Sequence, residues 1–245
     1  MYKIRKLLIC SAFATVAGYA MADEQVIKEP GNTYKTYLPS SVRAEGGTTG
    51  YGGAFTWDVN PIVGVTLGYN GGNVSWSDNL KVNGSKYDLD MNNNNVYLNA
   101  EIHPWGNSQG MWAKSAYVAA GAAYLDNDYD ITRNVSNGRN FSVNNTDFNA
   151  TSDVKMNGKL SYKNDIAPYV GLGLRPMFSD HWGMFSEVGA YYVGNPSVNL
   201  NSTGTATNGN GVNLNDAVAA EENKIASSEK YKWMPSAKVG VVYKF

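Results

Sequence analysis

The sequence predicts an all-β fold, an eight-stranded antiparallel transmembrane β-barrel with short periplasmic turns and longer extracellular loops. Three observations support this prediction: an N-terminal secretion signal, segments in which apolar and polar residues alternate, and a last segment that ends on an aromatic residue. A chain that crosses a bilayer without long apolar helices must close its strands, because only a closed barrel satisfies every backbone amide in lipid. The predicted location is therefore the outer membrane of a Gram-negative cell.

The first 22 residues have the pattern of a secretion signal. Three basic residues precede an apolar run of about 14 residues, and a small-x-small cleavage site follows at Ala20-Met21-Ala22. The run is shorter than the roughly 20 residues that a membrane-spanning helix needs. We therefore predict that residues 1–22 are removed and that residues 23–245 form one outer-membrane β-barrel domain.

The composition of the predicted mature chain excludes several kinds of chemistry. It has 17 basic against 21 acidic residues and no cysteine, because the signal contains three of the basic residues and Cys10. An acidic balance does not favour binding to nucleic acid. No disulfide or thiol chemistry is possible, and no phosphate loop or metal-ligand spacing is present. We predict no cofactor and no metal.

Barrel strands are recognisable as segments of about ten residues in which every second residue is apolar. In residues 63–69, Val63, Val65 and Leu67 alternate with small or polar residues, which places one apolar face toward lipid. Seven segments are clear, and an eighth gives the even number that bacterial single-chain barrels use. The predicted strands lie near residues 36–45, 50–58, 62–76, 87–103, 112–130, 157–176, 183–200 and 231–245. The same alternation predicts that Leu172→Arg, on the lipid face, is costly and that Gly171→Ser, on the lumen face, is tolerated.

The connections and the tryptophans support this arrangement. Residues 58–61, 104–110 and 178–182 form short, periplasmic turns, whereas 77–86, 131–156 and 201–230 are longer and extracellular, with a short helix around 216–226. Tryptophan rings favour the lipid headgroup level. The predicted membrane-interface anchors are Trp57, Trp105, Trp112 and Trp182 on the periplasmic side and Trp76 and Trp233 on the outer side.

The last segment predicts how the protein reaches its membrane. Val239, Val241, Tyr243 and the terminal Phe245 share one face. An aromatic residue at the end of such a strand resembles the signal that the outer-membrane assembly machinery recognises. We therefore predict that Phe245 is this signal and that the machinery is a partner.

Because successive side chains of a strand point to opposite faces, the alternation in each predicted strand also shows which residues point into the barrel. We call this the parity of a residue. It directs six charged residues inward, together with Tyr97, Tyr169 and Tyr191. The lumen and selectivity candidates are Arg43, Glu45, Glu101, Arg175, Glu187 and Lys238. Eight strands enclose an interior that side chains nearly fill. Two interpretations remain open: a plug of paired charges, or a narrow movable gate whose carboxylates Glu101 and Glu187 attract a cationic amino acid.

Acidic residues also gather at the predicted outer strand ends. These outer-mouth candidates are Asp88, Asp90, Asp126, Asp128 and Asp130. A negative mouth would concentrate cations by electrostatic focusing. The alternative is that these residues are ordinary solvated strand ends.

Several long runs are specific enough to indicate a family. They are Gly47–Ala54 (GTTGYGGA), Gly68–Gly72 (GYNGG), Lys86–Ile102 (KYDLDMNNNNVYLNAEI), Ala119–Asp130 (AAGAAYLDNDYD), Ser161–Tyr169 (SYKNDIAPY) and Glu187–Tyr192 (EVGAYY). Together these runs resemble the CarO family of carbapenem-associated outer-membrane proteins, over most of the mature chain apart from the loops near 132–154 and 201–229. The resemblance implies an eight-stranded barrel linked to uptake of small basic amino acids such as ornithine and to carbapenem susceptibility.

Three classes of function follow: a channel, a non-conducting structural or adhesive barrel, and a lipid-active enzyme. His103 and His181 both lie beside predicted periplasmic turns, and no Gly-x-Ser-x-Gly elbow accompanies them, so we predict that the protein is not an enzyme. The predicted function is passive uptake of small solutes, especially basic amino acids such as ornithine, with carbapenem entry. Expected partners are outer-membrane lipid, lipopolysaccharide and small solutes.

Overall fold

The computed structural model describes residues 38–82, 85–162 and 165–245. All elements below belong to one compact unit, Ser40–Phe245. The predicted signal at residues 1–22 lies outside the described residues and stays a prediction. None of the helices in the described ranges is long and apolar enough to cross a membrane.

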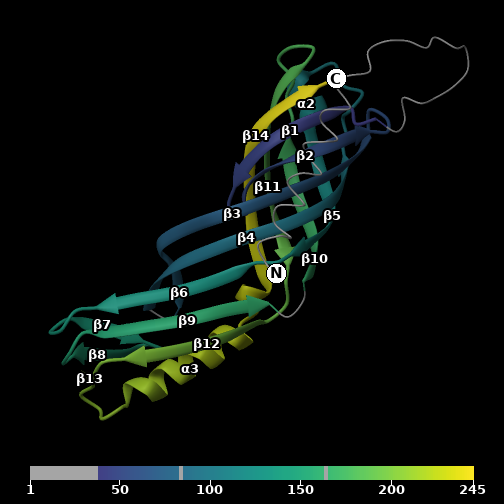
Figure 1. Cartoon of the computed structure of the whole chain (residues 1–245). Helices are drawn as coiled ribbons and strands as arrows, with labels where there is room; N and C mark the ends of the chain where they lie inside the picture. Colours follow the sequence, from purple (N-terminus) through teal and green to yellow (C-terminus); the bar gives the residue numbers. More distant parts are fainter. Residues whose placement is uncertain (1–37, 83–84, 163–164) are drawn as a thin grey trace, which may run out of the picture. The chain divides into compact units, whose positions relative to one another are not determined.

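Eight antiparallel strands close into a barrel (Figure 1). They are β1 (Ser41–Gly47), β2 (Gly50–Asp58), β3 (Val63–Val82), β4 (Ser85–Ile102), β5 (Ala116–Leu125), β10 (Ile166–Leu174), β11 (Trp182–Tyr192) and β14 (Trp233–Lys244). Each strand pairs with the next in this order, and β14 pairs with β1 to close the ring. The predicted fold class is confirmed.

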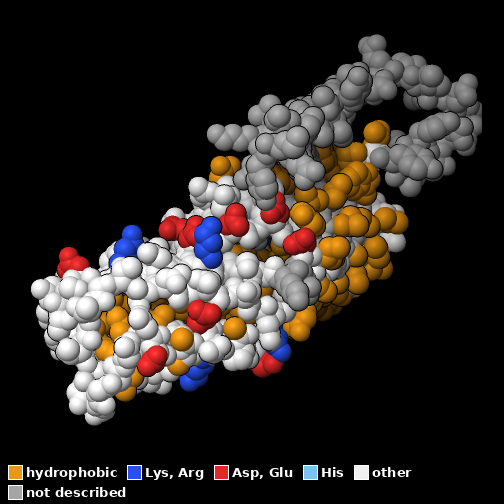
Figure 2. Space-filling view, turned by 60° about the horizontal axis from the view of Figure 1, so that its bottom comes forward, with side chains coloured by type: hydrophobic (Ala, Val, Ile, Leu, Met, Phe, Trp, Pro, Cys, Tyr) orange, Lys and Arg blue, Asp and Glu red, His pale blue; other side chains and the backbone are white. Residues whose placement is uncertain are grey.

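Side-chain alternation gives the barrel an apolar outer face. On β10, Val170 and Leu172 are 50% and 62% exposed, whereas Tyr169 and Gly171, on the opposite face of the strand, are buried, with Tyr169 only 4% exposed. Val239 and Val241 on β14 are 61% and 45% exposed. Figure 2 shows hydrophobic side chains gathered over one end of this unit and polar and charged side chains over the other. The faces follow the period of two that the sequence predicts.

Short turns join the strands at one end of the barrel, which we call the periplasmic end. Asn60 forms the β2–β3 turn, where its Oδ1 accepts hydrogen bonds from the amides of Ile62 and Val63 at 2.8 and 2.9 Å. The helix α2 (Met111–Ser115) precedes β5 in another connection at this end. At the opposite end, β1 and β2 are joined by a tight turn. Gly50 has a φ of +98° there, a conformation that glycine adopts without strain.

The long connections are not the loops that the sequence predicts. They form further strands and a helix beyond the barrel, which we call the outer extension. Beyond the barrel, β4 pairs with β6 (Asp128–Val135), and β9 (Val154–Tyr162) and β12 (Pro196–Thr203) continue the sheet. A small sheet of β7 (Asn140–Val143), β8 (Thr146–Ala150) and β13 (Ala206–Thr207) completes it.

Four of the predicted strands are therefore wrong in extent. The strand predicted at 62–76 continues to Val82 as β3, and β4 begins at Ser85, so most of the predicted loop 77–86 is strand. Each of the segments 112–130, 157–176 and 183–200 contains one barrel strand and one strand of the outer extension. The chain leaves the barrel near Asp126 and again at Gly194, which has a φ of +75°. Alternation continues on both sides of these breaks, so the pattern alone does not show that the neighbouring strand changes.

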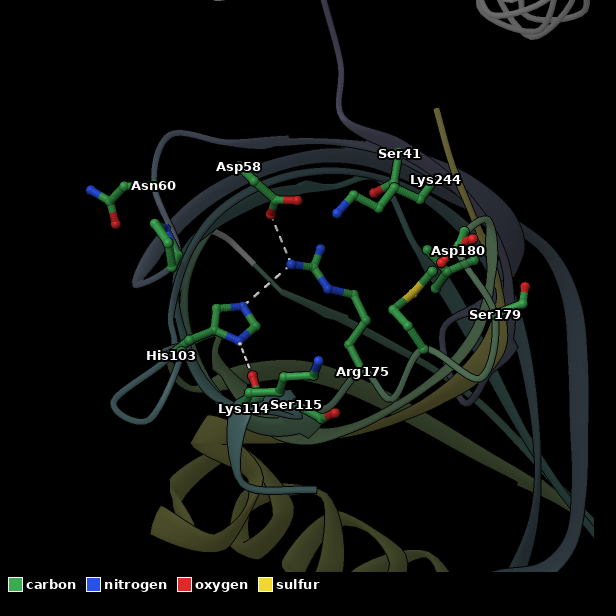
Figure 3. A pocket seen from close by; sticks show the side chains of 14 residues that line it. Ser41, Asp58, Asn60, His103, Lys114, Ser115, Arg175, Ser179, Asp180 and Lys244 are labelled. Carbon is green, nitrogen blue, oxygen red and sulfur yellow. Dashed lines mark hydrogen bonds and ion pairs between the residues drawn. The ribbon is translucent and has the colours of Figure 1, made fainter. Parts of the chain in front are cut away.

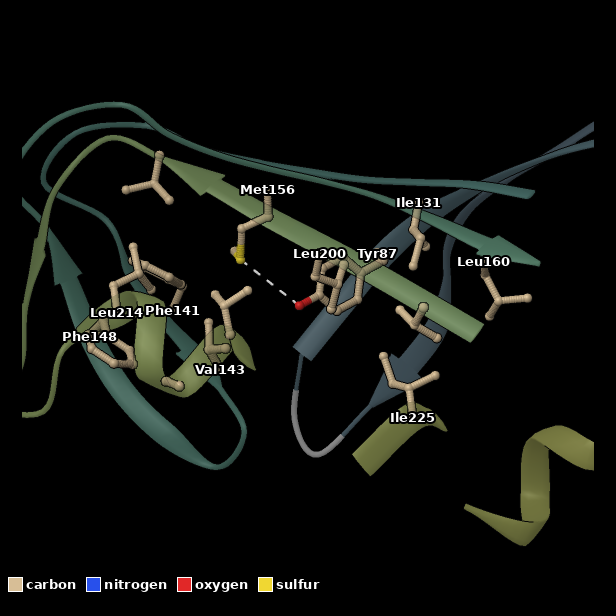
Figure 4. Close-up of a cluster of buried hydrophobic side chains, with 14 of the residues drawn as sticks. Tyr87, Ile131, Phe141, Val143, Phe148, Met156, Leu160, Leu200, Leu214 and Ile225 are labelled. Atoms are coloured by element: carbon tan, nitrogen blue, oxygen red, sulfur yellow. Dashed lines mark hydrogen bonds between the residues drawn. The ribbon is translucent and has the colours of Figure 1, made fainter. Parts of the chain in front are cut away.

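The outer extension has its own apolar core, which Figure 4 shows around Tyr87, Met156 and Ile225. The helix α3 (Leu214–Ser227) covers it and confirms the helix predicted around 216–226. Asn213 caps α3, because its Oδ1 accepts a hydrogen bond from the amide of Asn215 at 2.8 Å. A 3₁₀ turn, η2 (Glu229–Lys232), then leads back to β14.

Candidate functional site

The six charged residues that parity directs inward come together within the barrel. Arg43 and Glu45 lie on β1, Glu101 on β4, Glu187 on β11 and Lys238 on β14, and each of these five residues is at most 5% exposed. Arg175 follows β10 directly and has a side chain that is 11% exposed. Charges this deeply buried must be paired, and the contacts divide them into two clusters.

The first cluster surrounds Arg43. Its Nε lies 3.0 Å from Glu45 Oε2, and its Nη1 lies 3.0 Å from Glu101 Oε1. Its Nη2 donates a hydrogen bond to Tyr97 Oη at 3.1 Å. Its Cζ lies over the ring of Phe185, 4.4 Å from the ring centroid. All three nitrogens of Arg43 are thus bonded, which makes this arginine a rigid centre of the cluster.

The carboxylates of this cluster have further donors. Tyr97 Oη donates to Glu45 Oε1 at 2.6 Å, and Asn70 Nδ2 donates to the same oxygen at 2.8 Å. Thr66 Oγ1 donates to Glu101 Oε1 at 2.7 Å. Thr66 and Asn70 have the inward parity of β3, but sequence reasoning did not select them because neither is charged. Hydrogen bonds to a buried carboxylate stabilise its charged form.

The second cluster contains Glu187 and Lys238, which are direct cross-strand neighbours on β11 and β14. Lys238 Nζ lies 2.9 Å from Glu187 Oε1. Tyr169 Oη donates to Glu187 Oε1 at 2.8 Å, and Tyr117 Oη donates to Glu187 Oε2 at 2.9 Å. The Lys238 ammonium also lies 4.1 Å from the ring centroid of Tyr97, in the position of a cation–π contact.

The tyrosine rings reach these carboxylates by lying flat on glycines of neighbouring strands. A Cβ at Gly68 would lie 2.2 Å from Tyr97 Cζ, and a Cβ at Gly173 would lie 2.2 Å from Tyr117 Cζ. Larger residues at these positions would displace the rings. Sequence reasoning did not select Tyr117, although its place on the inward face of β5 would have identified it.

A solvent-open cavity of about 560 Å³ lies at the periplasmic end of the barrel (Figure 3). Its charged lining comprises Asp58, Lys114, Arg175, Asp180 and Lys244, and His103 also lines it. Arg175 connects this cavity with the first cluster, because its Nη2 donates to Asp58 Oδ1 at 2.8 Å while its Nη1 lies 3.3 Å from Glu101 Oε2.

His103 lies beside Arg175 just beyond the end of β4. Its Nδ1 is 3.3 Å from the carbonyl oxygen of Lys114, and its Nε2 is 3.4 Å from Arg175 Nη2. Burial lowers the pKa of His103, and the positive charge of Arg175 lowers it further. Both contacts fit the tautomer that donates from Nδ1 to the Lys114 carbonyl oxygen and accepts at Nε2 from Arg175. The second histidine, His181, is exposed and contacts the carbonyl oxygen of Lys244 at 3.0 Å.

The acidic residues predicted at the outer mouth do not line the lumen. Asp90 and Asp130 are direct neighbours on β4 and β6, and Asp88 and Asp128 share their face. The opposite face carries the buried Tyr87, Tyr129 and Ile131 of the outer extension. On β4 this buried face has the same parity as the barrel interior, so the four aspartates continue the outside of the barrel. Asp126 accepts a hydrogen bond from Asn94 Nδ2 at 3.1 Å.

Most of the predicted interface residues occupy strand ends. Trp105, Trp112 and Trp182 are exposed at the periplasmic end, and Trp57 is half-buried near the end of β2. Trp233 is exposed at the opposite end, where its ring lies 5.1 Å from that of Tyr192. Trp76 lies on β3, but its side chain is outside the described residues. The terminal Phe245 follows β14, and its amide donates to the carbonyl oxygen of Ser40 at 3.0 Å.

A closed eight-stranded barrel with an apolar outer face and paired charges inside defines an integral β-barrel protein of the outer membrane. The chain is 61% identical to the protein in the crystal structure of Acinetobacter baumannii CarO, with a TM-score of 0.77 over 86% of this chain and 99% of that one. The chain therefore belongs to the CarO family.

A second crystal structure, of Acinetobacter baumannii CarO2, is 52% identical to the chain, with a TM-score of 0.77 over 85% of this chain and 99% of that one. No protein-family model matches the chain, and no curated protein matches it significantly. These relatives support the outer-membrane location and the barrel, and the resemblance drawn from the sequence is confirmed.

Proposed function

We propose that the barrel is a passive uptake route for small solutes, with basic amino acids such as ornithine as its preferred class, and that it is not an enzyme. The observation that carries the proposal is the Lys238–Glu187 contact, in which the lumen accommodates a desolvated primary ammonium group at 2.9 Å from a carboxylate. Ornithine carries the same group. Outer-membrane lipid, lipopolysaccharide and the assembly machinery are the proposed partners.

The ion pairs of the lumen support a preference for cations, because they contain more carboxylates than cations. They join Glu45, Glu101, Glu187 and Asp58 to Arg43, Arg175 and Lys238. The remaining charges of the periplasmic cavity, Asp180, Lys114 and Lys244, lie outside these pairs. In a narrow lumen the effective dielectric is well below that of water, and a unit charge at about 4 Å interacts by roughly 4 kcal/mol before desolvation is subtracted. A cationic solute is therefore attracted more strongly than a zwitterion of no net charge.

The second candidate function is a non-conducting structural barrel. It is favoured by the burial of both clusters, since Arg43, Glu101, Glu187 and Lys238 are each no more than 2% exposed. In this arrangement the side chains close the lumen. Passage of a solute then requires some of these side chains to move, whereas a structural barrel requires none to do so.

Solute flux distinguishes the two functions. Purified protein with Glu101→Gln and Glu187→Gln is incorporated into liposomes, and entry of ornithine and glycine is measured beside thermal stability. The uptake proposal expects ornithine entry to fall more than glycine entry. An unchanged ratio with a lowered melting temperature would favour the structural barrel.

A matched control and a third solute complete this experiment. Asp130→Asn removes a carboxylate that is 55% exposed on the outer extension, and the ratio of the two fluxes should not change in that variant. Carbapenem entry, which the family resemblance implies, belongs to the same proposal. It is tested by adding a carbapenem to the same liposomes.

A further inference from the structure

We propose that Lys238 is a tethered occupant of a binding site for primary alkylammonium groups, which it vacates when a solute passes. The site comprises Glu187 as the anion, Tyr117 and Tyr169 as the residues that hold it, and Tyr97 as an aromatic wall. We call it the ammonium site. The inference rests on the proposed uptake function and names the position at which a cationic solute binds.

The anion of the ammonium site is held in place without help from Lys238. Tyr169 Oη and Tyr117 Oη donate to different oxygens of Glu187, at 2.8 and 2.9 Å. The Tyr169 ring is itself fixed against glycine, since a Cβ at Gly189 would lie 2.4 Å from Tyr169 Oη. The carboxylate and its two donors therefore keep their geometry when the lysine side chain moves away.

Lys238 is held less firmly than Arg43, the other buried cation of the barrel strands. Arg43 bonds through all three nitrogens, to Glu45, Glu101 and Tyr97. Lys238 Nζ has one close anionic contact, and within the described part of the chain it makes no well-directed hydrogen bond, although the atom is buried. An ammonium has three donors. Arg43 thus has the contacts of a structural residue, whereas Lys238 leaves much of its bonding capacity unused.

The aromatic contacts select an ammonium group. Lys238 Nζ lies 4.1 Å from the ring centroid of Tyr97 and 5.5 Å from that of Tyr169. Both distances are within the range of a cation–π contact, which desolvation strengthens. A compact primary ammonium satisfies the ring faces and the carboxylate together. A quaternary ammonium meets the rings but has no proton to donate to Glu187.

Chemical rescue tests the inference. In Lys238→Ala the carboxylate and the rings remain while the tethered cation is lost, so the thermal unfolding temperature of the purified barrel in detergent should fall. Propylammonium chloride should raise it again in a saturable manner, because a ligand that binds only the folded state stabilises it. Ornithine should do the same. Sodium chloride and tetramethylammonium chloride at equal ionic strength should not.

Two control variants define the result. Lys238→Met fills the site with an uncharged chain and should not respond to propylammonium. Lys159→Ala removes a lysine whose side chain is 79% exposed, at 4.0 Å from Asp130, and should show no response specific to amines. If Lys238→Ala does not fold in amine-free buffer, refolding with and without propylammonium gives the same answer, because only the amine should increase the folded fraction on heat-modifiable gels.

The outcomes separate this inference from the uptake proposal. An absence of rescue, or equal rescue by all three salts, would show that Lys238–Glu187 is only a structural ion pair. Rescue without ornithine flux in the wild type would retain the ammonium site and overturn uptake. Selective ornithine flux without rescue would retain uptake and overturn the ammonium site.

Discussion

Replacing Glu187 with glutamine should destabilise the barrel more than replacing Glu101 in the same way. Lys238 has a fully buried side chain, and Glu187 is the carboxylate that neutralises it at 2.9 Å. Breaking a buried pair by removing one partner costs about 3–5 kcal/mol, because the other charge stays buried and uncompensated. Glu187→Gln should therefore lower the free energy of unfolding by about this amount.

Glu101→Gln leaves no cation without a partner. Arg43 keeps Glu45 at 3.0 Å, and Arg175 keeps Asp58 at 2.8 Å. The free energy of unfolding then falls only by the contribution of hydrogen bonds to charged groups, about 1.5–3 kcal/mol. We expect Glu187→Gln to be the more destabilising change by roughly 2 kcal/mol, the difference between the two ranges.

Equilibrium unfolding in urea, with the protein in detergent micelles, measures both changes through tryptophan fluorescence and gel mobility. The double variant Glu187→Gln with Lys238→Met removes both charges, so it should recover part of the stability lost in Glu187→Gln. Coupling energies between residues in contact are about 0.5–3 kcal/mol. Equal losses in the two single variants, or a larger loss in Glu101→Gln, would refute the division of the network into two clusters.

Four further changes test other parts of the fold. Leu172→Arg places a charge on the lipid face two residues before the end of β10. A charge at the bilayer midplane costs about 2–4 kcal/mol of folding free energy, and this position should show the lower part of that range, so the folding yield into liposomes should fall. Gly171→Ser, which parity alone treats as tolerated, should lower the melting temperature, because its Cβ would lie 2.5 Å from Tyr169 Oη; an unchanged value would show that the ring moves freely. Deleting Phe245 should reduce the amount of folded barrel in cells, measured by heat-modifiable migration, while leaving folding in detergent intact. Glu221→Gln should increase hydrogen exchange in the outer extension and not in the barrel, since this buried carboxylate accepts hydrogen bonds from Ser85 Oγ at 2.9 Å, from Tyr87 and from the amide of Asn144.

The sequence by itself determined the faces of the barrel strands. Alternation is a local property of one strand, so it correctly placed Val170 and Leu172 outside and Glu101, Glu187 and Lys238 inside. The sequence also indicated α3, because a helix is likewise a local feature that spans only a few turns of the chain. These features need no knowledge of which strand is the neighbour.

Only the tertiary structure decided where the barrel ends and which charges meet. Asp90 and Asp130 were expected at the mouth, but β6 leaves the barrel and places them on the outside of the outer extension. The pairing of Arg43 with Glu101, and of Lys238 with Glu187, depends on the stagger between strands in the closed ring. Stagger is a relation between strands far apart in sequence, so the alternation within one strand carries no information about it.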